Sequence, residues 1–394
     1  MIQNPTPGKA LQYAGEFCFP RLSGTRFEEE AQGTILKIFD SLGLEPKIEQ
    51  FQADYLLIKL CSRIALLPFG ILILLGGIFY YFESPLSALV FFILALFIGL
   101  GFALYCQSSP EFLGLKNRFW SKNFYIQIGK EKPEKEILII AHYDSKSQSF
   151  PIWLRILVYY LGGLFSVLAS GLGIFLVYKY LTASFFLPLW GWIFIFLALI
   201  DFLPIFNRLD NKSPGAVDNA GALGVIFELA EIFKEQFLSR TRLWLVLTGA
   251  EELGLLGSRN FVKNHKAELG PNQSWVINLD GLGVDYSISA LSRLGFPGKK
   301  TDPELNNLIK SIAQEKNLKF KMIRASLGFS TDAYSFLKAG YKAVSLGNIN
   351  RFIHSSEDSI EHLISVNLDD YVQLLKELIY KIDQAASEKN DKRY

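Results

Sequence analysis

The sequence predicts an α/β fold in which a mixed central sheet is flanked by helices and interrupted by two inserted transmembrane helical hairpins. Two observations predict this fold class. Hydrophobic residues make up 50% of the 394 positions, and much of the excess lies in a few long apolar runs. Outside those runs, short apolar segments typical of buried strands alternate with segments of helical periodicity.

Four long runs contain no charged residue; they cover residues 64–82, 84–110, 156–178 and 180–200. Each is close to the roughly 20 residues that span a bilayer as a helix. Core helices of soluble domains usually keep a polar stripe, whereas these runs are apolar on all sides. A tight turn at Glu83–Pro85 joins the first pair, and the segment from Lys179 to Ser184 joins the second. We therefore expect two hairpins, each returning to the side from which it entered.

Basic residues indicate which side of the membrane holds the polar domain. Only Lys179 lies at a hairpin tip. Because Lys and Arg are enriched in cytoplasmic segments, this asymmetry predicts an integral membrane protein with a cytoplasmic polar domain. The residues that flank the outer ends of the hairpins are Lys59, Arg63, Lys116, Arg118, Lys122, Arg155, Arg208 and Lys212.

Without the hairpins at 63–106 and 153–206, the rest of the chain forms one continuous α/β pattern. We therefore expect a single domain in three parts, and a frayed tail at 384–394. The three parts are residues 1–62, 107–152 and 207–394.

Apolar residues at helical spacing predict five helices in this domain. In the first, Phe27, Ile35, Leu36 and Phe39 share one face, and Gly43 ends the helix. The five helices are predicted at residues 26–43, 219–238, 254–268, 302–316 and about 366–386.

Apolar or alternating segments between these helices predict the strands. The segment EILIIAHYD has the continuous apolar run of a central strand that is buried on both faces. The strands are predicted near residues 47–60, 123–129, 136–144, 242–249, 274–280 and 343–348.

The net charge is only +2, and Lys and Arg are scattered, so the composition indicates no nucleic-acid partner. Cys18, Cys61 and Cys106 form neither a CxxC pair nor a zinc-finger spacing. This sparse, odd count fits a reducing compartment better than a disulfide framework.

Residues that can carry chemistry fall in five short segments, several of which directly follow an apolar strand. In open α/β sheets, ligands bind in the crevice outside the carboxyl ends of the strands. The fold would therefore gather these segments into one site. They are AHYDS (141–145), GAVDNAG (215–221), GAEELGLLGS (249–258), NLDGLG (278–283) and FIHSSEDS (352–359).

The first segment pairs His142 with Asp144. Neutral imidazole is a good zinc ligand, and the second ring nitrogen of a metal-bound histidine is usually held by a carboxylate or carbonyl. Alternation along a strand puts both side chains on one face, so Asp144 could support His142. Taken alone, the pair is better explained by a structural histidine that is hydrogen-bonded in a turn.

Glu251 and Glu252 follow another apolar strand. Adjacent carboxylates are costly to bury unpaired, and the alternative is an exposed helix start, where acidic residues favour the helix dipole. Adjacent side chains point in different directions, so one can bind a metal while the other reaches a water molecule. That arrangement suits hydrolysis.

The remaining candidates are single residues. Asp218 precedes a predicted helix and could simply cap it, whereas Asp280, between an apolar strand and a glycine, favours a buried functional carboxylate. His354 lies in a polar loop. His362, in an amphipathic segment, favours a structural role, and we expect His265, on a charged helix, to be exposed to solvent.

Together these segments offer two histidines, three carboxylates and a spare glutamate at one sheet edge. Such a set suits two divalent cations about 3.5–4 Å apart that share a bridging carboxylate. The motif order resembles the zinc aminopeptidase family: HxD, DN, EE with GLLGS, NxD, and a His with a nearby Asp. That family includes bacterial leucyl-type and Streptomyces-type aminopeptidases and, more distantly, glutamate carboxypeptidase and the transferrin receptor. The similarity runs through nearly all of the polar chain and implies a zinc exopeptidase-like fold.

The resemblance also implies a site for two Zn²⁺ ions per chain. One ion would be held by His142 and Asp280. The other would be held by Glu252 and His354, and Asp218 would bridge the two.

The implied catalytic residues are Glu251, as the base that activates a water between the metals, and Asp144, which orients His142. The implied enzyme is a membrane-bound zinc metallopeptidase, an aminopeptidase that hydrolyses N-terminal residues from peptides. Its partners would be a peptide substrate and the lipid bilayer, the latter through four transmembrane helices.

The sequence departs from the family in two places. His142 and Asp218 are 76 positions apart, because the second hairpin lies between motifs that a short loop joins in soluble relatives. The usual S-D-H segment is Ser330-Thr331-Asp332-Ala333 here, which puts substrate contacts from that loop in doubt.

Three alternatives stay open. A glutaminyl cyclase-like enzyme with a single zinc shares the HYDSK-like strand end, but the DNAG and EELGLLGS segments favour hydrolysis. A catalytically inactive peptidase-like scaffold is disfavoured by an intact Glu251. A transporter is disfavoured because Asp201 is the only acidic residue in the second hairpin, and it lies near a helix end.

Overall fold

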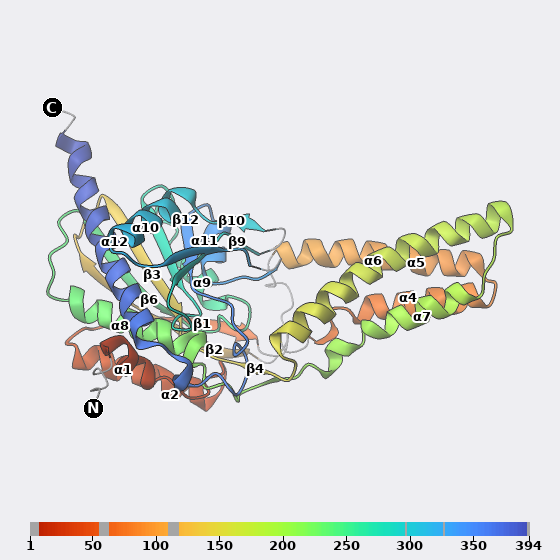
Figure 1. The fold of residues 1–394 in the computed structure, drawn as a ribbon, viewed down its shortest axis with the longest axis horizontal. Helices are drawn as coiled ribbons and strands as arrows, with labels where there is room; N and C mark the ends of the chain where they lie inside the picture. Colours follow the sequence, from red (N-terminus) through yellow and green to blue (C-terminus); the bar gives the residue numbers. More distant parts are fainter. Residues whose placement is uncertain (1–7, 55–62, 109–117, 296–297, 326–327, 392–394) are drawn as a thin grey trace. The chain divides into compact units, whose positions relative to one another are not determined.

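The computed structural model describes residues 8–54, 63–108, 118–295, 298–325 and 328–391. The chain forms two compact units. The first comprises Met1–Ala53, Arg118–Ser147 and Asp210–Tyr394, and the second comprises Asp54–Asn117 and Gln148–Leu209. A sheet lies at the centre of the first unit, and the second unit consists mainly of apolar helices (Figure 1).

The central sheet has eight strands in the order β1-β2-β6-β3-β7-β12-β8-β11. Its four middle strands run parallel: β6 (Thr241–Thr248), β3 (Lys135–His142), β7 (Ser274–Leu279) and β12 (Lys342–Leu346). β2 is antiparallel to β6, and β8 is antiparallel to β12. Parallel strands end at the same edge, so the segments after these four strands emerge side by side. The outer strands are β1 (Lys47–Asp54), β2 (Arg118–Gly129), β8 (Ile288–Leu291) and β11 (Phe320–Ile323).

Alternating side chains of the middle strands fill two cores, one on each face of the sheet. In β3, Ile137 and Ile139 belong to one core, and Leu138 and Ile140 belong to the other. The larger core is covered by α1 (Lys9–Gly15), α2 (Arg26–Ser41), α8 (Gly221–Phe233), α10 (Pro303–Glu315) and α12 (Ser365–Asp391). The smaller core is covered by α9 (Leu256–His265) and α11 (Ala333–Lys338). Because both faces are covered, the middle strands need continuous apolar sequence.

The predicted mixed sheet flanked by helices is confirmed. Helix α12 continues to Asp391, beyond the predicted end at 386. Of the predicted first strand, residues 55–60 lie outside the described residues. The sequence did not reveal α1, β8, β11 or α11, which are all short; in β11, Lys321 and Met322 are both exposed, so the strand carries no alternating pattern.

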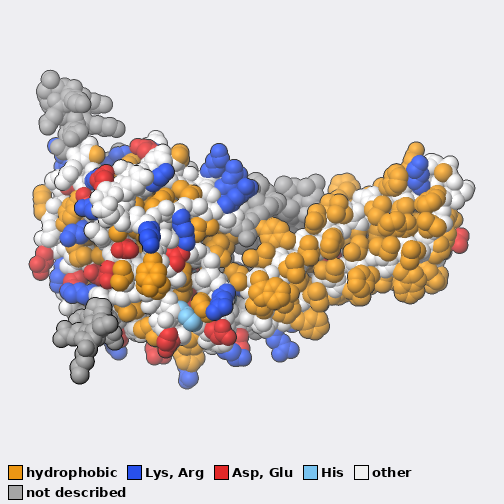
Figure 2. All heavy atoms as spheres, viewed as in Figure 1, with side chains coloured by type: hydrophobic (Ala, Val, Ile, Leu, Met, Phe, Trp, Pro, Cys, Tyr) orange, Lys and Arg blue, Asp and Glu red, His pale blue; other side chains and the backbone are white. Residues whose placement is uncertain are grey.

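Four helices make up most of the second unit: α4 (Leu67–Tyr81), α5 (Pro85–Ser108), α6 (Ile152–Ala183) and α7 (Leu189–Ile200). They pack around Phe92 and Phe194, whose ring centroids are 4.8 Å apart. Gly76 and Gly173 allow this approach, because an added Cβ at either would meet the Phe92 ring. Large apolar side chains remain exposed on these helices, as Figure 2 shows for one face.

Among the described residues of this unit, two segments are long and apolar enough to cross a membrane, rather than the predicted four. They are Ile152–Ala183, with 32 residues, and Leu189–Phe206, with 18 residues. The helix Leu67–Tyr81 has 15 residues, which at 1.5 Å per residue is shorter than a hydrocarbon core of roughly 30 Å. Helix α5 has 24 residues, and its stretch Pro85–Gly99 is apolar.

The prediction that His265 is exposed is wrong. The residue is 7% exposed, and its ring lies 4.3 Å from that of Phe261. Its Nε2 lies 2.6 Å from Glu49 Oε1, and its Nδ1 lies 3.2 Å from Glu268 Oε2. The charged neighbours in the sequence are therefore ion-pair partners rather than a sign of solvation. Burial lowers the pKa of His265, but hydrogen bonds and charge pairing with the two glutamates outweigh it and raise the pKa above 6.5.

This arrangement predicts a pH-dependent stability. A raised folded-state pKa means that the stabilisation is fully present below 6.5 and is lost as pH rises through the raised value. We expect the melting temperature of wild type to exceed that of His265→Gln most at about pH 6, with the difference shrinking towards about pH 9. The same difference in melting temperature between wild type and His265→Gln at both pH values would contradict this assignment.

Candidate metal centre

The predicted site residues lie at the carboxyl edge of the sheet. His142 is the last residue of β3, and Asp280 directly follows β7. Glu251 and Glu252 follow β6, after Ala250 in a left-handed conformation with φ 52°. His354 lies in the loop after β12. The parallel order of these four strands thus explains why distant motifs converge.

Asp218 reaches the same edge from a distorted turn, Ala216–Ala220, that leads into α8. Asp218 has φ −120° and ψ 78°, outside the helical region, so the predicted continuous helix from 219 begins instead with an irregular segment. The side chain is 4% exposed.

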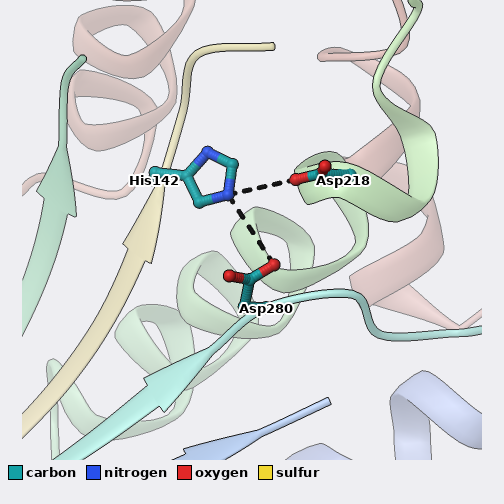
Figure 3. Close-up of side chains that lie close together, drawn as sticks. All are labelled: His142, Asp218 and Asp280. Atoms are coloured by element: carbon teal, nitrogen blue, oxygen red, sulfur yellow. Dashed lines mark ion pairs between the residues drawn. The ribbon is translucent and has the colours of Figure 1, made fainter. Parts of the chain in front are cut away.

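Three of these side chains form a first cluster (Figure 3). His142 Nε2 lies 3.2 Å from Asp218 Oδ1 and 3.8 Å from Asp280 Oδ1. One ligand atom from each residue lies within 4.8 Å of the other two, a spacing that could hold a metal ion.

A second cluster consists of Asp218, Glu252 and His354, again with one atom of each within 4.8 Å of the others. His354 Nε2 lies 3.0 Å from Glu252 Oε2 and 3.3 Å from Asp218 Oδ2. Lys146 Nζ contacts the same Glu252 oxygen at 2.8 Å and the Glu252 carbonyl oxygen at 3.0 Å.

Asp218 belongs to both clusters and offers a different oxygen to each. Its Oδ1 faces His142, and its Oδ2 faces His354. A carboxylate that divides its oxygens in this way can bridge two cations. Burial opposes its ionisation, but close pairing with His142 and His354 outweighs burial and holds the pKa of Asp218 well below its ordinary value.

Glu251 lies beside the first cluster, with Oε2 4.0 Å from His142 Nε2. Burial, together with repulsion from Glu252 and Asp280, raises the pKa of Glu251 well above its ordinary value, although His142 opposes this. A carboxyl group with a raised pKa can both take up and release a proton near neutral pH.

Asp144 contacts several segments of the site at once. Its backbone carbonyl oxygen lies 3.1 Å from His142 Nδ1, and its carboxylate Oδ1 lies 3.5 Å from the same nitrogen. The carboxylate also accepts hydrogen bonds from the amides of Glu251 and Glu252, at 3.1 and 3.3 Å. Asp144 therefore contacts both His142 and the backbone of the two glutamates.

The donor set fits zinc, for which imidazole nitrogen and carboxylate oxygen are common ligands. His142 Nε2 and Glu252 Oε1 are buried, and neither makes a hydrogen bond within the described part of the chain. Several carboxylates buried this close together repel one another, so a bound cation would offset a large charge penalty.

Several buried groups that support the site were not among the predicted site residues. Asp332, 0% exposed, accepts a hydrogen bond from Thr248, and its Oδ1 makes none among the described residues. Its place in the STDA segment was the only signal. Lys146 adjoins the HYDS motif and Asp358 lies in the FIHSSEDS segment, whereas Arg21 lies outside these motifs. His362 stacks on Phe352, with ring centroids 3.7 Å apart.

Residues 193–379 match the model of peptidase family M28. The chain carries a peptidase family M28 domain. The matched stretch includes Asp218, both glutamates, Asp280 and His354, whereas His142 and Asp144 precede it.

The chain is 30% identical over 179 residues to "Aminopeptidase YwaD" from Bacillus subtilis, covering 43% of this chain and 38% of the relative. It is 27% identical over 174 residues to "Probable leucine aminopeptidase" from Arthroderma benhamiae, covering 41% and 45%. The alignments thus span less than half the length of these relatives.

The fold of this chain is like that of solved structures over almost its full length. One is a zinc aminopeptidase from Bacillus subtilis, with a TM-score of 0.55 at 14% identity, covering 95% of this chain and 94% of that one. Another is an Acidobacteriales bacterium glutaminyl cyclase, with a TM-score of 0.53 at 12% identity, covering 98% of each chain. At these identities the likeness describes the fold alone.

The contacts of Asp144 predict a measurable loss of stability. In Asp144→Asn, an NH₂ group replaces one oxygen and would face an amide of Glu251 or Glu252. Leaving a buried hydrogen-bonding group unsatisfied costs about 1–3 kcal/mol, so the melting temperature should fall by several degrees. Asp302→Asn is the matched control, because Asp302 caps α10 and Asn caps helices as well as Asp. Equal melting temperatures for both variants would contradict the proposed contacts.

Proposed function

We propose that this chain is a membrane-bound aminopeptidase that uses two zinc ions to remove N-terminal residues from peptides. The observation that carries the proposal is the position of Asp218, whose two carboxylate oxygens face His142 and His354 separately. The M28 match supports a hydrolytic enzyme, and the relatives that this chain resembles include aminopeptidases.

The proposal assigns the metal ligands by cluster. His142, Asp280 and Asp218 would hold one zinc ion, and Glu252, His354 and Asp218 would hold the other. Bound zinc would polarise a peptide carbonyl and lower the pKa of water towards roughly 7.

The chain's own residues then supply proton transfer and orientation. Glu251 takes a proton from the attacking water and later delivers it to the leaving amine, a role that suits its raised pKa. Placed general bases typically contribute about 10² to 10⁴ in rate. The carbonyl oxygen of Asp144 contacts His142 Nδ1, so that Nε2 points into the site.

The apolar helices of the second unit support attachment to a bilayer. In the candidate spans Ile152–Ala183 and Leu189–Phe206, 39% and 28% of an apolar 18-residue stretch is buried, so most of each stretch stays exposed. An exposed apolar surface of this kind is typical of lipid contact. In this proposal α4 and α5 complete a second hairpin beside α6 and α7, and the basic flanks, Arg155 and Arg208 among them, support a cytoplasmic position of the M28 domain.

A glutaminyl cyclase-like reaction is the second candidate, because the fold likeness extends to glutaminyl cyclases. The cyclase reaction, as we infer it from the resemblance, uses a single zinc. Two complete clusters sharing Asp218 favour the hydrolase.

Replacement of Glu251, the proposed base, distinguishes peptide hydrolysis from the cyclase reaction. We expect Glu251→Gln, purified in detergent, to bind as much zinc as wild type but to lose about 10² to 10⁴ in hydrolysis of aminoacyl-p-nitroanilides. Glu235→Gln, an exposed glutamate elsewhere in the domain, is the matched control and should keep wild-type activity. Formation of pyroglutamate from an N-terminal glutamine peptide would favour the cyclase, and zinc-free wild type would favour an inactive scaffold.

Membrane attachment has its own test. We expect the full chain to sediment with membranes and to remain there after washing with high salt or carbonate. It should dissolve only in detergent, because charge screening does not release apolar helices that are embedded in a bilayer. Release into the supernatant by salt or carbonate would contradict the assignment of α6 and α7 as spans.

A further inference from the structure

The segments that carry His142 and Asp218 lie on opposite sides of the long insertion. One segment, Tyr143–Ser145, follows β3, and the other, Asn211–Gly215, leads to the Asp218 turn. Between them, residues Gln148–Leu209 belong to the second unit. A connection of this length constrains its ends only weakly, since the entropy of closing a loop changes slowly with length. The ends of the insertion pair as two short strands, β4 (Ser147–Gln148) and β5 (Leu209–Asp210), and contacts within the first unit add to this pairing.

The side chain of Arg21 makes such contacts and is 0% exposed. Its Nε donates to the Tyr143 carbonyl at 2.7 Å. Its Nη1 donates to the Pro214 carbonyl at 2.7 Å, and its Nη2 donates to the Gly215 carbonyl at 3.0 Å. Further hydrogen bonds to the carbonyls of Phe17 and Phe19 anchor the guanidinium to its own segment. One side chain thus links both sides of the insertion.

The backbone around Arg21 reinforces this link. The Arg21 amide donates to Ser145 Oγ at 3.0 Å, and the Ser145 amide donates to the Arg21 carbonyl at 3.2 Å. Ser145 Oγ in turn donates to the Ser213 carbonyl at 3.1 Å. Ser23 Oγ donates to Asp144 Oδ2 at 2.9 Å. The segment Arg21–Ser23 therefore contacts both flanks of the insertion through several hydrogen bonds.

Asp358 holds the other side of the Asp218 turn. Its carboxylate accepts hydrogen bonds from the amides of Val217 at 2.8 Å and Asp218 at 3.1 Å. Its carbonyl accepts a hydrogen bond from the Ala216 amide at 3.1 Å. Arg21 therefore binds carbonyls directly before the turn, and Asp358 binds amides within it.

Gly215 shows how closely the turn fits this arrangement. It has φ +63°, and a Cβ added there would lie 2.8 Å from both Arg21 Nη2 and Asp218 O. The turn therefore has little room to shift while Arg21 is in place.

We propose that Arg21 is a positioning residue for the metal centre. Its contacts fix the separation of His142 and Asp218, which lie before and after the insertion in the sequence. This inference rests on the proposed two-metal function. Metal coordination tolerates only about 0.2 Å of error in ligand distance, so a shift of the Asp218 turn weakens binding. The planar guanidinium offers five donors in a fixed fork, which the single ammonium of lysine cannot reproduce.

The experiment uses the full chain in detergent and Co²⁺ as a spectroscopic probe in place of zinc. Arg21→Lys and Arg21→Met should weaken Co²⁺ binding by about 10- to 100-fold, as other changes behind metal ligands do. They should also change the visible absorption spectrum of bound Co²⁺. Leu378→Ala is the matched control: it removes a buried side chain of α12 and lowers the melting temperature, but should leave Co²⁺ affinity and spectrum unchanged.

The outcomes separate this inference from the proposed function. Arg21 variants that fold and bind Co²⁺ with wild-type affinity and spectrum overturn the inference and leave the two-metal site standing. Wild type that binds neither Co²⁺ nor Zn²⁺ overturns the proposed function itself. If neither Arg21 variant folds, Ser145→Ala, which deletes one hydroxyl of the same connection, provides the test. A loss of about 10-fold in affinity supports the positioning role, and unchanged affinity contradicts it.

Discussion

Four carboxyl groups and two imidazoles share one buried space at the sheet edge, and their charge is the constraint on which the rest of the structure depends. Asp218, Glu251 and Glu252 are each less than 10% exposed, and His142 is 1% exposed. Like charges at this spacing raise one another's pKa values unless cations or imidazoles compensate. The division of the Asp218 oxygens between His142 and His354 indicates how two cations would satisfy the cluster.

Each part of the first unit contributes to holding these groups in place. The parallel strands β3, β6 and β7 bring three ligand-bearing segments to one edge. Asp144 joins two of those segments by hydrogen bonds, and Arg21 and Asp358 fix the turn that carries Asp218. This network also explains how the domain tolerates an insertion between two motifs of its site, because the geometry is set by contacts rather than by chain continuity.

The sequence predicted the sheet, its middle strands and the convergence of the motif residues, because buried parallel strands leave continuous apolar runs and ligand-type residues followed them. Arg21 and Asp358 could not be predicted in the same way, since they bind backbone groups whose positions depend on the fold. His265 was predicted wrongly because its charged neighbours in the sequence are its partners in space. Four spans were predicted from apolar runs, but the helix Leu67–Tyr81 is shorter than its run.

The central claim is that two zinc ions lie on either side of Asp218. Anomalous X-ray diffraction at the zinc edge, from crystals of the full chain, tests it most directly. The account predicts two peaks about 3.5–4 Å apart, one beside His142 and Asp280 and the other beside Glu252 and His354. A single peak, or peaks away from Asp218, would contradict it.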